Sequence, residues 1–296
     1  MQQIDLVYRL IDEYPDHLAY AESSRDVLDI FGSGNHRIAS LLGIEGLHQI
    51  GGSASVLRLY HRLGVKYATL THTCHNEFAD SEEPTVPLHG GLSEAGVALI
   101  KEMNRIGMMV DLSHTSWQTQ RDAFRVTKAP VVYSHSNAFA LCAHTRNVPD
   151  DLLQTLKANG GVIMATFYPA FVDANASKIT LDKVADHIEY LGNTIGYDHV
   201  GIGSDFDGMM AGPKGLEDVS KYPDLVEELL NRGFSEENVS LVMGKNVLRV
   251  MDEVKRVAKT LGDQKPLEDD VKKFFEELDF GSQRQSARRL RIQYEA

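Results

Sequence analysis

Cysteine is scarce in this chain of 296 residues, which contains only two. The pair Cys74 and Cys142 is too few for a disulfide scaffold or for a zinc site made of thiolates, and whether the two form a bridge stays open here. Positive charge is scarce as well, because 30 Lys and Arg stand against 42 Asp and Glu, a formal net charge of −12. The acidic balance and the absence of a basic stripe argue against nucleic acid as a partner.

Long apolar runs are also absent, so no segment reaches the length that a membrane span requires. The first residues, "MQQIDLVYRLIDEYPD", have the pattern of an amphipathic helix with acidic side chains rather than of a signal peptide. The C-terminus is polar and has no signal for a lipid anchor. We therefore expect a cytoplasmic chain without a membrane anchor.

No glycine-rich phosphate loop follows a predicted strand, which argues against a dinucleotide-binding domain. Six short runs rich in Val, Ile, Ala and Tyr are continuous rather than alternating, which is typical of a parallel sheet covered on both faces. The predicted strands are 38–44, 65–71, 108–112, 131–134, 161–167 and 199–204. The predicted helices are 53–63, 93–106, 116–127, 149–158, 180–196, 223–232 and 235–260. This alternation predicts an α/β fold, either a (β/α) barrel or a doubly wound sheet.

Ionisable side chains follow five of the six predicted strands. They are Glu45, His72, His114, His135 and Asp205. In a (β/α) barrel the carboxyl ends of the strands converge on one face, and imidazoles with carboxylates favour zinc over magnesium. A single histidine at a strand end is usually an ordinary polar residue, so the recurrence carries the argument for a functional cluster. We expect no such role for His75, His89 and His144 in loops, or for His187, which we predict to be a solvated helix residue.

Several long motifs resemble those of the renal, or membrane, dipeptidase family. They are "GIEGLHQIGGSASVLRLYHRLGVKYATLTHTCHNEFADS", "MMVDLSHTS", "APVVYSHSNAFALCAHTRNVPDDLL", "GIGSDFDGM" and "GLEDVSKYPDLVEELLNRGFSEENVSLVMGKNVLRV". The resemblance runs from the first helix to about residue 255. It implies a zinc metallodipeptidase with an amidohydrolase-like (β/α)8 barrel, which hydrolyses dipeptides with a metal-activated water.

The resemblance also implies a set of metal ligands. Glu45 corresponds to the carboxylate that bridges two zinc ions, and His114 and His135 complete the ligands of the second zinc. Asp205 corresponds to a residue near the first zinc that delivers a proton to the leaving amine.

Substrate contacts are implied in the same way. His72 corresponds to the residue that polarises the scissile carbonyl, and Arg146 to the one that holds the C-terminal carboxylate of the dipeptide. The family also uses an aromatic hydroxyl beyond the fifth of these strands. Tyr168 is available for this role, with Phe171 as the other residue that matches the place.

One motif of the family is missing. The family carries His-x-Asp on its first barrel strand, where the pair binds the first zinc, but none of the 12 histidines here is followed two places later by Asp. Met1 matches a position just before the helix that precedes the third barrel strand. We therefore expect a barrel that lacks its first two strands, with open edges at 38–44 and 199–204. One zinc, at Glu45, His114 and His135, would be retained, and activity would be below that of the family.

The expected organisation is an incomplete barrel over 1–262 and a C-terminal helical or tail extension over 263–296. A longer form with a secretion signal would be secreted instead. The family tends to dimerise, so a homodimer is expected. Two other readings stay open: a non-catalytic relative that serves as a binding module, and an amidohydrolase that acts on a cyclic amide. The preferred dipeptide does not follow from the sequence.

Overall fold

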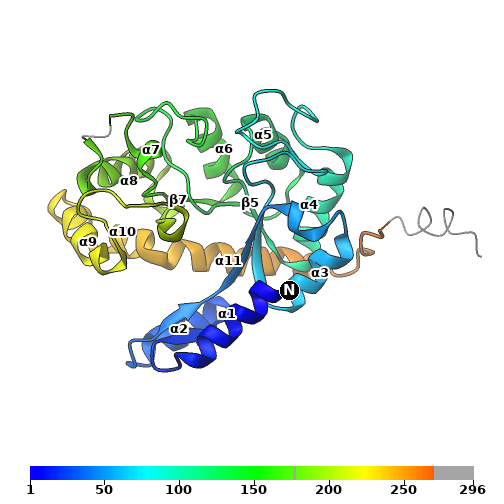
Figure 1. The fold of residues 1–296 in the computed structure, drawn as a ribbon, viewed down its shortest axis with the longest axis horizontal. Helices are drawn as coiled ribbons and strands as arrows, with labels where there is room; N and C mark the ends of the chain where they lie inside the picture. The colour runs from blue at the N-terminus through cyan, green and yellow to red at the C-terminus, as the bar shows by residue number, and fades with distance from the viewer. Residues whose placement is uncertain (176–177, 270–296) are drawn as a thin grey trace, which may run out of the picture.

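A six-stranded parallel sheet forms the centre of the computed structural model, which describes residues 1–175 and 178–269 (Figure 1). Its strands lie side by side in chain order: β3 (Leu42–Glu45), β4 (Val65–Thr69), β5 (Met109–Asp111), β6 (Val132–Tyr133), β7 (Val162–Ala165) and β8 (Val200–Ile202). Every neighbouring pair is parallel. The predicted α/β class is confirmed, and each of the six predicted strands contributes to this sheet. Among the described residues β3 and β8 are its two edges, as expected.

The strand predicted over 38–44 is wrong as a single element. It is divided at Leu41 into β2 (Ile38–Ser40) and β3, and β2 pairs with β1 (Leu18–Tyr20) in a separate two-stranded sheet. A register shift between Leu42 and Gly43 accompanies the division. The ring of Tyr67 crosses β3 there, so closely that a Cβ at Gly43 would lie 2.2 Å from it. The small sheet forms a lobe with α1 (Gln2–Glu13) and α2 (Ser24–Gly32), below the main sheet in Figure 1.

Most helices lie within a residue or two of their predicted bounds. They are α3 (Ala54–Arg62), α4 (Glu94–Ile106), α5 (Trp117–Val126), α6 (Asp150–Asn159), α8 (Leu181–Ile195) and α9 (Tyr222–Asn231). Ser53, Ser93 and Ser116 cap α3, α4 and α5 by accepting a backbone N–H from the first turn, as N-cap serines do. The short helix α7 (Pro169–Val172) was not predicted. Short 3₁₀ helices are η1 (Leu47–Ile50), η3 (Tyr197–His199), η4 (Phe206–Gly208) and η5 (Val219–Lys221).

The helix predicted over 235–260 is interrupted. It consists of α10 (Glu236–Ser240), the π-helical segment η6 (Leu241–Lys245) and α11 (Asn246–Thr260). The interruption coincides with Gly244, whose φ of 162° is not helical. In Figure 1, α11 runs across the width of the sheet. Its Val250 and Val254 pack in a buried cluster with Met109 and Val132, at the amino ends of β5 and β6.

This packing covers the amino ends of the strands and leaves their carboxyl ends uncovered by α11. A larger core fills the space between the sheet and the outer helices, and fully buried Leu57, Ile100, Leu153 and Ile188 supply one layer from α3, α4, α6 and α8. In the part of the chain that the structure describes, no helix is both long and apolar enough to cross a membrane.

The segment after α11 returns to the domain. The backbone of Leu267 accepts a hydrogen bond from Arg58 at 2.7 Å and donates one to Glu102 at 3.1 Å, so residues up to 269 lie on α3 and α4. This segment includes the start of the predicted extension over 263–296. Residues 270–296 of that extension lie outside the described residues.

Candidate metal centre and active site

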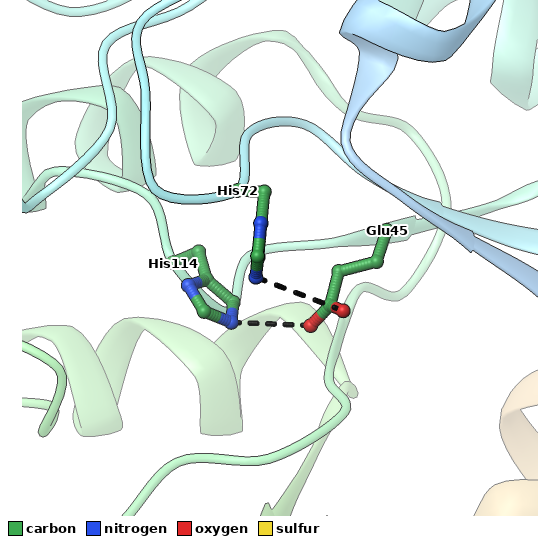
Figure 2. A group of neighbouring side chains, drawn as sticks. All are labelled: Glu45, His72 and His114. Atoms are coloured by element: carbon green, nitrogen blue, oxygen red, sulfur yellow. Dashed lines mark ion pairs between the residues drawn. The ribbon is translucent and has the colours of Figure 1, made fainter. Parts of the chain in front are cut away.

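Four of the predicted site residues meet at the carboxyl ends of neighbouring strands. Glu45 is the last residue of β3, and His72, His114 and His135 lie two or three residues beyond β4, β5 and β6. Parallel strands with adjacent ends bring these side chains to one rim of the sheet, which is where catalytic groups of (β/α) folds gather. Figure 2 shows the Glu45 carboxylate facing both His72 and His114, with one oxygen directed at each ring.

The closest contacts centre on one carboxylate oxygen. Glu45 Oε1 lies 3.1 Å from His114 Nε2 and 3.2 Å from His135 Nε2, and the two Nε2 atoms are 2.9 Å apart. The second oxygen, Oε2, lies 3.8 Å from His72 Nε2. The rings of His72 and His114 are also neighbours, with centroids 4.5 Å apart.

These distances suit a cation held by three ligands. Atoms separated by about 3 Å can all lie about 2.0–2.2 Å from one ion, the usual distance from zinc to imidazole nitrogen or carboxylate oxygen. The donor set of two imidazoles and one carboxylate is typical of zinc sites that keep an open position. Burial of His114 and His135 with half-exposed Glu45 leaves such a position on the solvent side. The residues present therefore fit a metal.

The protonation of the cluster favours metal binding. Hydrogen bonds with His114 and then His135 hold the pKa of the Glu45 carboxyl well below its usual range, although burial acts in the opposite direction. Burial lowers the pKa of His114 to about 4, and its contact with Glu45 only partly offsets this. At neutral pH the carboxylate is thus ionised and this imidazole is neutral, which are the forms that coordinate metals.

A hydrogen-bonded chain behind His135 fixes its orientation. His135 Nδ1 lies 2.8 Å from Ser134 Oγ, which donates to Asp111 Oδ2 at 2.5 Å. Asp111 is completely buried and also accepts from Thr69 Oγ1 at 2.6 Å and from the backbone N–H of Ser113 at 3.1 Å. Partners of this kind fix the tautomer of a metal-binding histidine. Our reading of the sequence missed this chain, although an acidic residue inside the apolar strand "MMVDL" was a signal for it.

Asp205 lies on the same rim, beyond β8, but forms no ion pair among the described residues. Its backbone is left-handed, with φ 65°, and its carboxylate lies directly over Gly208, where a Cβ would be 2.2 Å from Oδ1. Burial is the main reason why the pKa of Asp205 is raised, and nearby Glu45 adds to the rise. A carboxyl group of raised pKa is suited to proton transfer.

Arg146 contributes a buried cation next to the histidines. Its guanidinium lies 3.4 Å from the backbone oxygen of His135, 3.5 Å from Ser136 Oγ and 5.0 Å from the ring centroid of Phe171. Burial lowers the pKa of Arg146, but arginine stays charged at any pH of interest. A buried cation with only long hydrogen bonds is ready to receive an anion.

The two aromatic candidates occupy different places. Phe171 is the one that contacts the Arg146 guanidinium, and Tyr168 stacks on the Phe171 ring with ring centroids 4.4 Å apart. Tyr168 is therefore one ring removed from Arg146.

The remaining histidines divide into two groups. His75, His89 and His144 hold loop backbone through ring nitrogens, as ordinary polar residues do. The prediction that His187 is solvated is wrong, because it is 1% exposed within α8. Its ring meets the backbone of two other segments, at Ala138 N and at Val172 O, which explains why a helix residue with polar neighbours in sequence is buried.

A family model described as "Membrane dipeptidase (Peptidase family M19)" matches residues 1–265. Among curated proteins, the chain is 64% identical to "Dipeptidase aclJ" of Aspergillus oryzae over 276 residues, which cover 93% of this chain and 65% of that protein. The chain therefore spans just under two thirds of the length of this curated relative.

Solved structures of similar proteins have the same fold as this chain. An amidohydrolase from Pseudomonas aeruginosa is 28% identical, with a TM-score of 0.78 over 86% of this chain and 83% of that one. A metallopeptidase from Rhodobacter sphaeroides, solved with a phosphinate mimic of the dipeptide L-Ala-D-Ala, is also 28% identical. Its TM-score is 0.73, over 80% of this chain and 69% of that one. These likenesses support the expected amidohydrolase-like barrel architecture.

Proposed function

Because the chain belongs to the membrane dipeptidase family, peptidase family M19, we propose that it hydrolyses dipeptides with the help of a bound zinc ion. One observation carries the proposal. The three ligand atoms of Glu45, His114 and His135 lie 2.9–3.2 Å from one another, next to the buried guanidinium of Arg146. A metal bound by these ligands could act on the peptide bond, while the nearby guanidinium binds the free carboxylate of a short peptide.

Glu45, His114 and His135 would hold one zinc ion. M19 peptidases are metal-dependent, and the neutral imidazole of His114 and the ionised Glu45 are ready to bind without releasing protons. The chemistry that such a cation supplies is Lewis acidity, together with a lowered pKa of water near it.

The protein's own groups account for the remaining steps. His72, whose ring faces Glu45 and His114, would donate a hydrogen bond to the carbonyl oxygen as negative charge develops there. Asp205 would accept the proton of the attacking water and deliver it to the leaving amine, a task that its raised pKa favours. As a further contact, we assign the Tyr168 hydroxyl to the substrate.

Arg146 would set the length of the substrate. Its guanidinium can pair with the C-terminal carboxylate of a dipeptide, whereas a tripeptide would place a neutral amide at that point. Losing the charge-assisted hydrogen bonds between Arg146 and a carboxylate costs roughly 1–3 kcal/mol, which corresponds to about ten- to a hundredfold in discrimination.

The open edges of the sheet bear on assembly. Strands β3 and β8 each have one paired side among the described residues, and such edges present unpaired backbone groups to other chains. We therefore propose a homodimer, to be tested by light scattering on the purified chain.

The function is tested by zinc content and turnover on one sample. We expect about one zinc per chain, and hydrolysis of Ala-Ala well above that of Ala-Ala-Ala and of the amide of Ala-Ala. His135→Ala should lose both zinc and turnover, whereas His17→Ala, which removes an exposed histidine of the N-terminal lobe, should retain both. Zinc without turnover would instead favour a non-catalytic relative that keeps the fold as a binding module. Equal cleavage of dipeptide and tripeptide would refute the role given to Arg146.

A further inference from the structure

Glu82 is a buried carboxylate that none of the steps above uses. It lies in the loop between β4 and α4, and its side chain is 4% exposed. Its Oε1 atom is 3.5 Å from Arg146 Nε, and neither of these two buried atoms has a hydrogen-bond partner among the described residues. The two charges are thus close but are not joined by a directional bond.

Arg146 has other contacts besides Glu82. Its outer nitrogens donate to Ser136 Oγ and to the backbone of His135, and its plane lies over Phe171. The backbone N–H of Arg146 donates to His144 Nδ1 at 3.1 Å. These contacts orient the guanidinium, so what Glu82 contributes to it is negative charge.

The loop holds Glu82 in place. Its backbone N–H donates to the oxygen of His114 at 3.0 Å, and its Oε2 accepts from Thr145 Oγ1 at 2.6 Å. Two residues earlier, Asp80 is buried and its carboxylate accepts backbone N–H groups from residues 88–91, which fastens the other end of the loop. Glu82 is therefore a fixed charge beside Arg146 rather than a mobile one.

The geometry points to Glu82 as a specificity-determining residue whose charge weakens the hold of Arg146 on a carboxylate. This inference rests on the proposed function. A substrate carboxylate that pairs with Arg146 meets a cation already partly neutralised, so binding is weaker than it would be to the arginine alone. The free amino acid produced from the C-terminal residue carries the same carboxylate, and its release is faster for the same reason.

The size of the effect follows from the distance between charges. At an effective dielectric constant of about 20, two like charges about 12 Å apart repel by about 1.4 kcal/mol, which is equivalent to a tenfold change in affinity. A carboxylate that pairs with Arg146 lies closer to Glu82 than this, so removing the charge of Glu82 without changing its shape should tighten carboxylate binding about tenfold or more.

The test is calorimetric binding of a phosphinate mimic of Ala-Ala, and of its C-terminal amide, to the zinc-loaded chain. Glu82→Gln should bind the mimic about tenfold more tightly than the wild type and bind the amide with unchanged affinity. The matched control is Glu83→Gln, the same charge change at the next residue of the loop, which is exposed. It should leave both affinities within twofold, and Glu82→Asp, which keeps the charge, should remain close to the wild type.

Several outcomes would overturn the inference. It fails if Glu82→Gln binds the mimic no more tightly than the wild type does, while the thermal unfolding of the two chains is the same. It also fails if the substitution increases the affinity for the amide as much as that for the mimic, or if neither chain binds the mimic. Tighter binding by Glu82→Gln in a chain that hydrolyses no dipeptide would support the inference and refute the proposed function. The two are thus separable in one set of measurements.

Discussion

Replacing Ser134 by alanine is expected to weaken zinc binding while the fold stays intact. The hydroxyl of Ser134 connects the ring of His135, at 2.8 Å, to the buried carboxylate of Asp111, at 2.5 Å. Without it the His135 ring loses its only outer partner among the described residues and is free to rotate or to change tautomer. The Nε2 atom that faces Glu45 then presents itself to the metal for only part of the time.

The magnitude follows from the groups left without partners. His135 is 7% exposed, so water cannot fully replace the lost partner of its Nδ1. A buried donor without an acceptor, here Nδ1 of His135, costs about 1–3 kcal/mol. Asp111 adds little to this cost, because it keeps hydrogen bonds from Thr69 and from the backbone of Ser113. If most of this cost falls on the bound state, zinc affinity decreases roughly ten- to a hundredfold, which is the range found for outer partners of metal-binding histidines.

The assay is competition for zinc against a fluorescent chelator, with thermal unfolding of the metal-free chains measured in parallel. Ser235→Ala is the matched control, because Ser235 caps α10, far along the chain from the ligands, by accepting the N–H of Asn238. It should destabilise the fold by about 1 kcal/mol and leave zinc affinity unchanged. The reasoning is refuted if Ser134→Ala binds zinc within twofold of the wild type, or if Ser235→Ala loses as much affinity.

Three further predictions concern other groups. Arg146→Lys should raise KM for Ala-Ala at least tenfold with a smaller change in kcat, measured by steady-state kinetics, because lysine cannot make the paired contact. Asp205→Asn should lower kcat/KM at least a hundredfold in the same kinetic assay, because an amide cannot accept the proton of the attacking water. Burial lowers the pKa of His187 in the folded state. Below about pH 6.5 the unfolded chain therefore binds a proton at this histidine that the folded chain does not bind, which favours unfolding. The free energy of unfolding should thus fall between pH 7.5 and 5.5, by up to about 1 kcal/mol more in the wild type than in His187→Gln, as denaturant titrations would show.

Much of the fold could be predicted because local signals and buried patterns agreed. Apolar runs such as "GVIMATF" marked largely buried strands, and Ser93, the first residue of the helix predicted over 93–106, is the N-cap of α4. The break at Leu41 could not be read in the same way. The ring of Tyr67, a residue of the next strand, lies against Gly43 just after the break, and no pattern within 38–44 records that contact. The break before α11 had a visible signal in Gly244, but glycine inside a helix is often tolerated.

The residues of the candidate site also differ in how well the sequence predicts them. Residues that follow strands could be predicted as a group, because adjacent parallel strands bring their ends together whatever the loops do. Outer partners could not, since each depends on how a loop returns. Glu82 lies beside Arg146 in a loop whose backbone is hydrogen-bonded to that of His114, and Glu82 and Arg146 are far apart in sequence. The burial of His187 was also missed: we predicted a solvated helix residue, but its ring contacts the backbone of two distant segments.

The ligands of the metal site differ in how firmly they are held, and this follows from their places in the sheet. His114 and His135 come after β5 and β6, which have neighbours on both sides, and His135 is tied to Asp111 through Ser134. Glu45 ends β3, an edge strand among the described residues whose register shifts at its start, and its side chain is 44% exposed. The two histidines are therefore more deeply buried than the carboxylate, and His135 is also held by hydrogen bonds. Any chain that pairs with the free side of β3 would act on the site first through Glu45, so zinc affinity should respond to assembly at that edge.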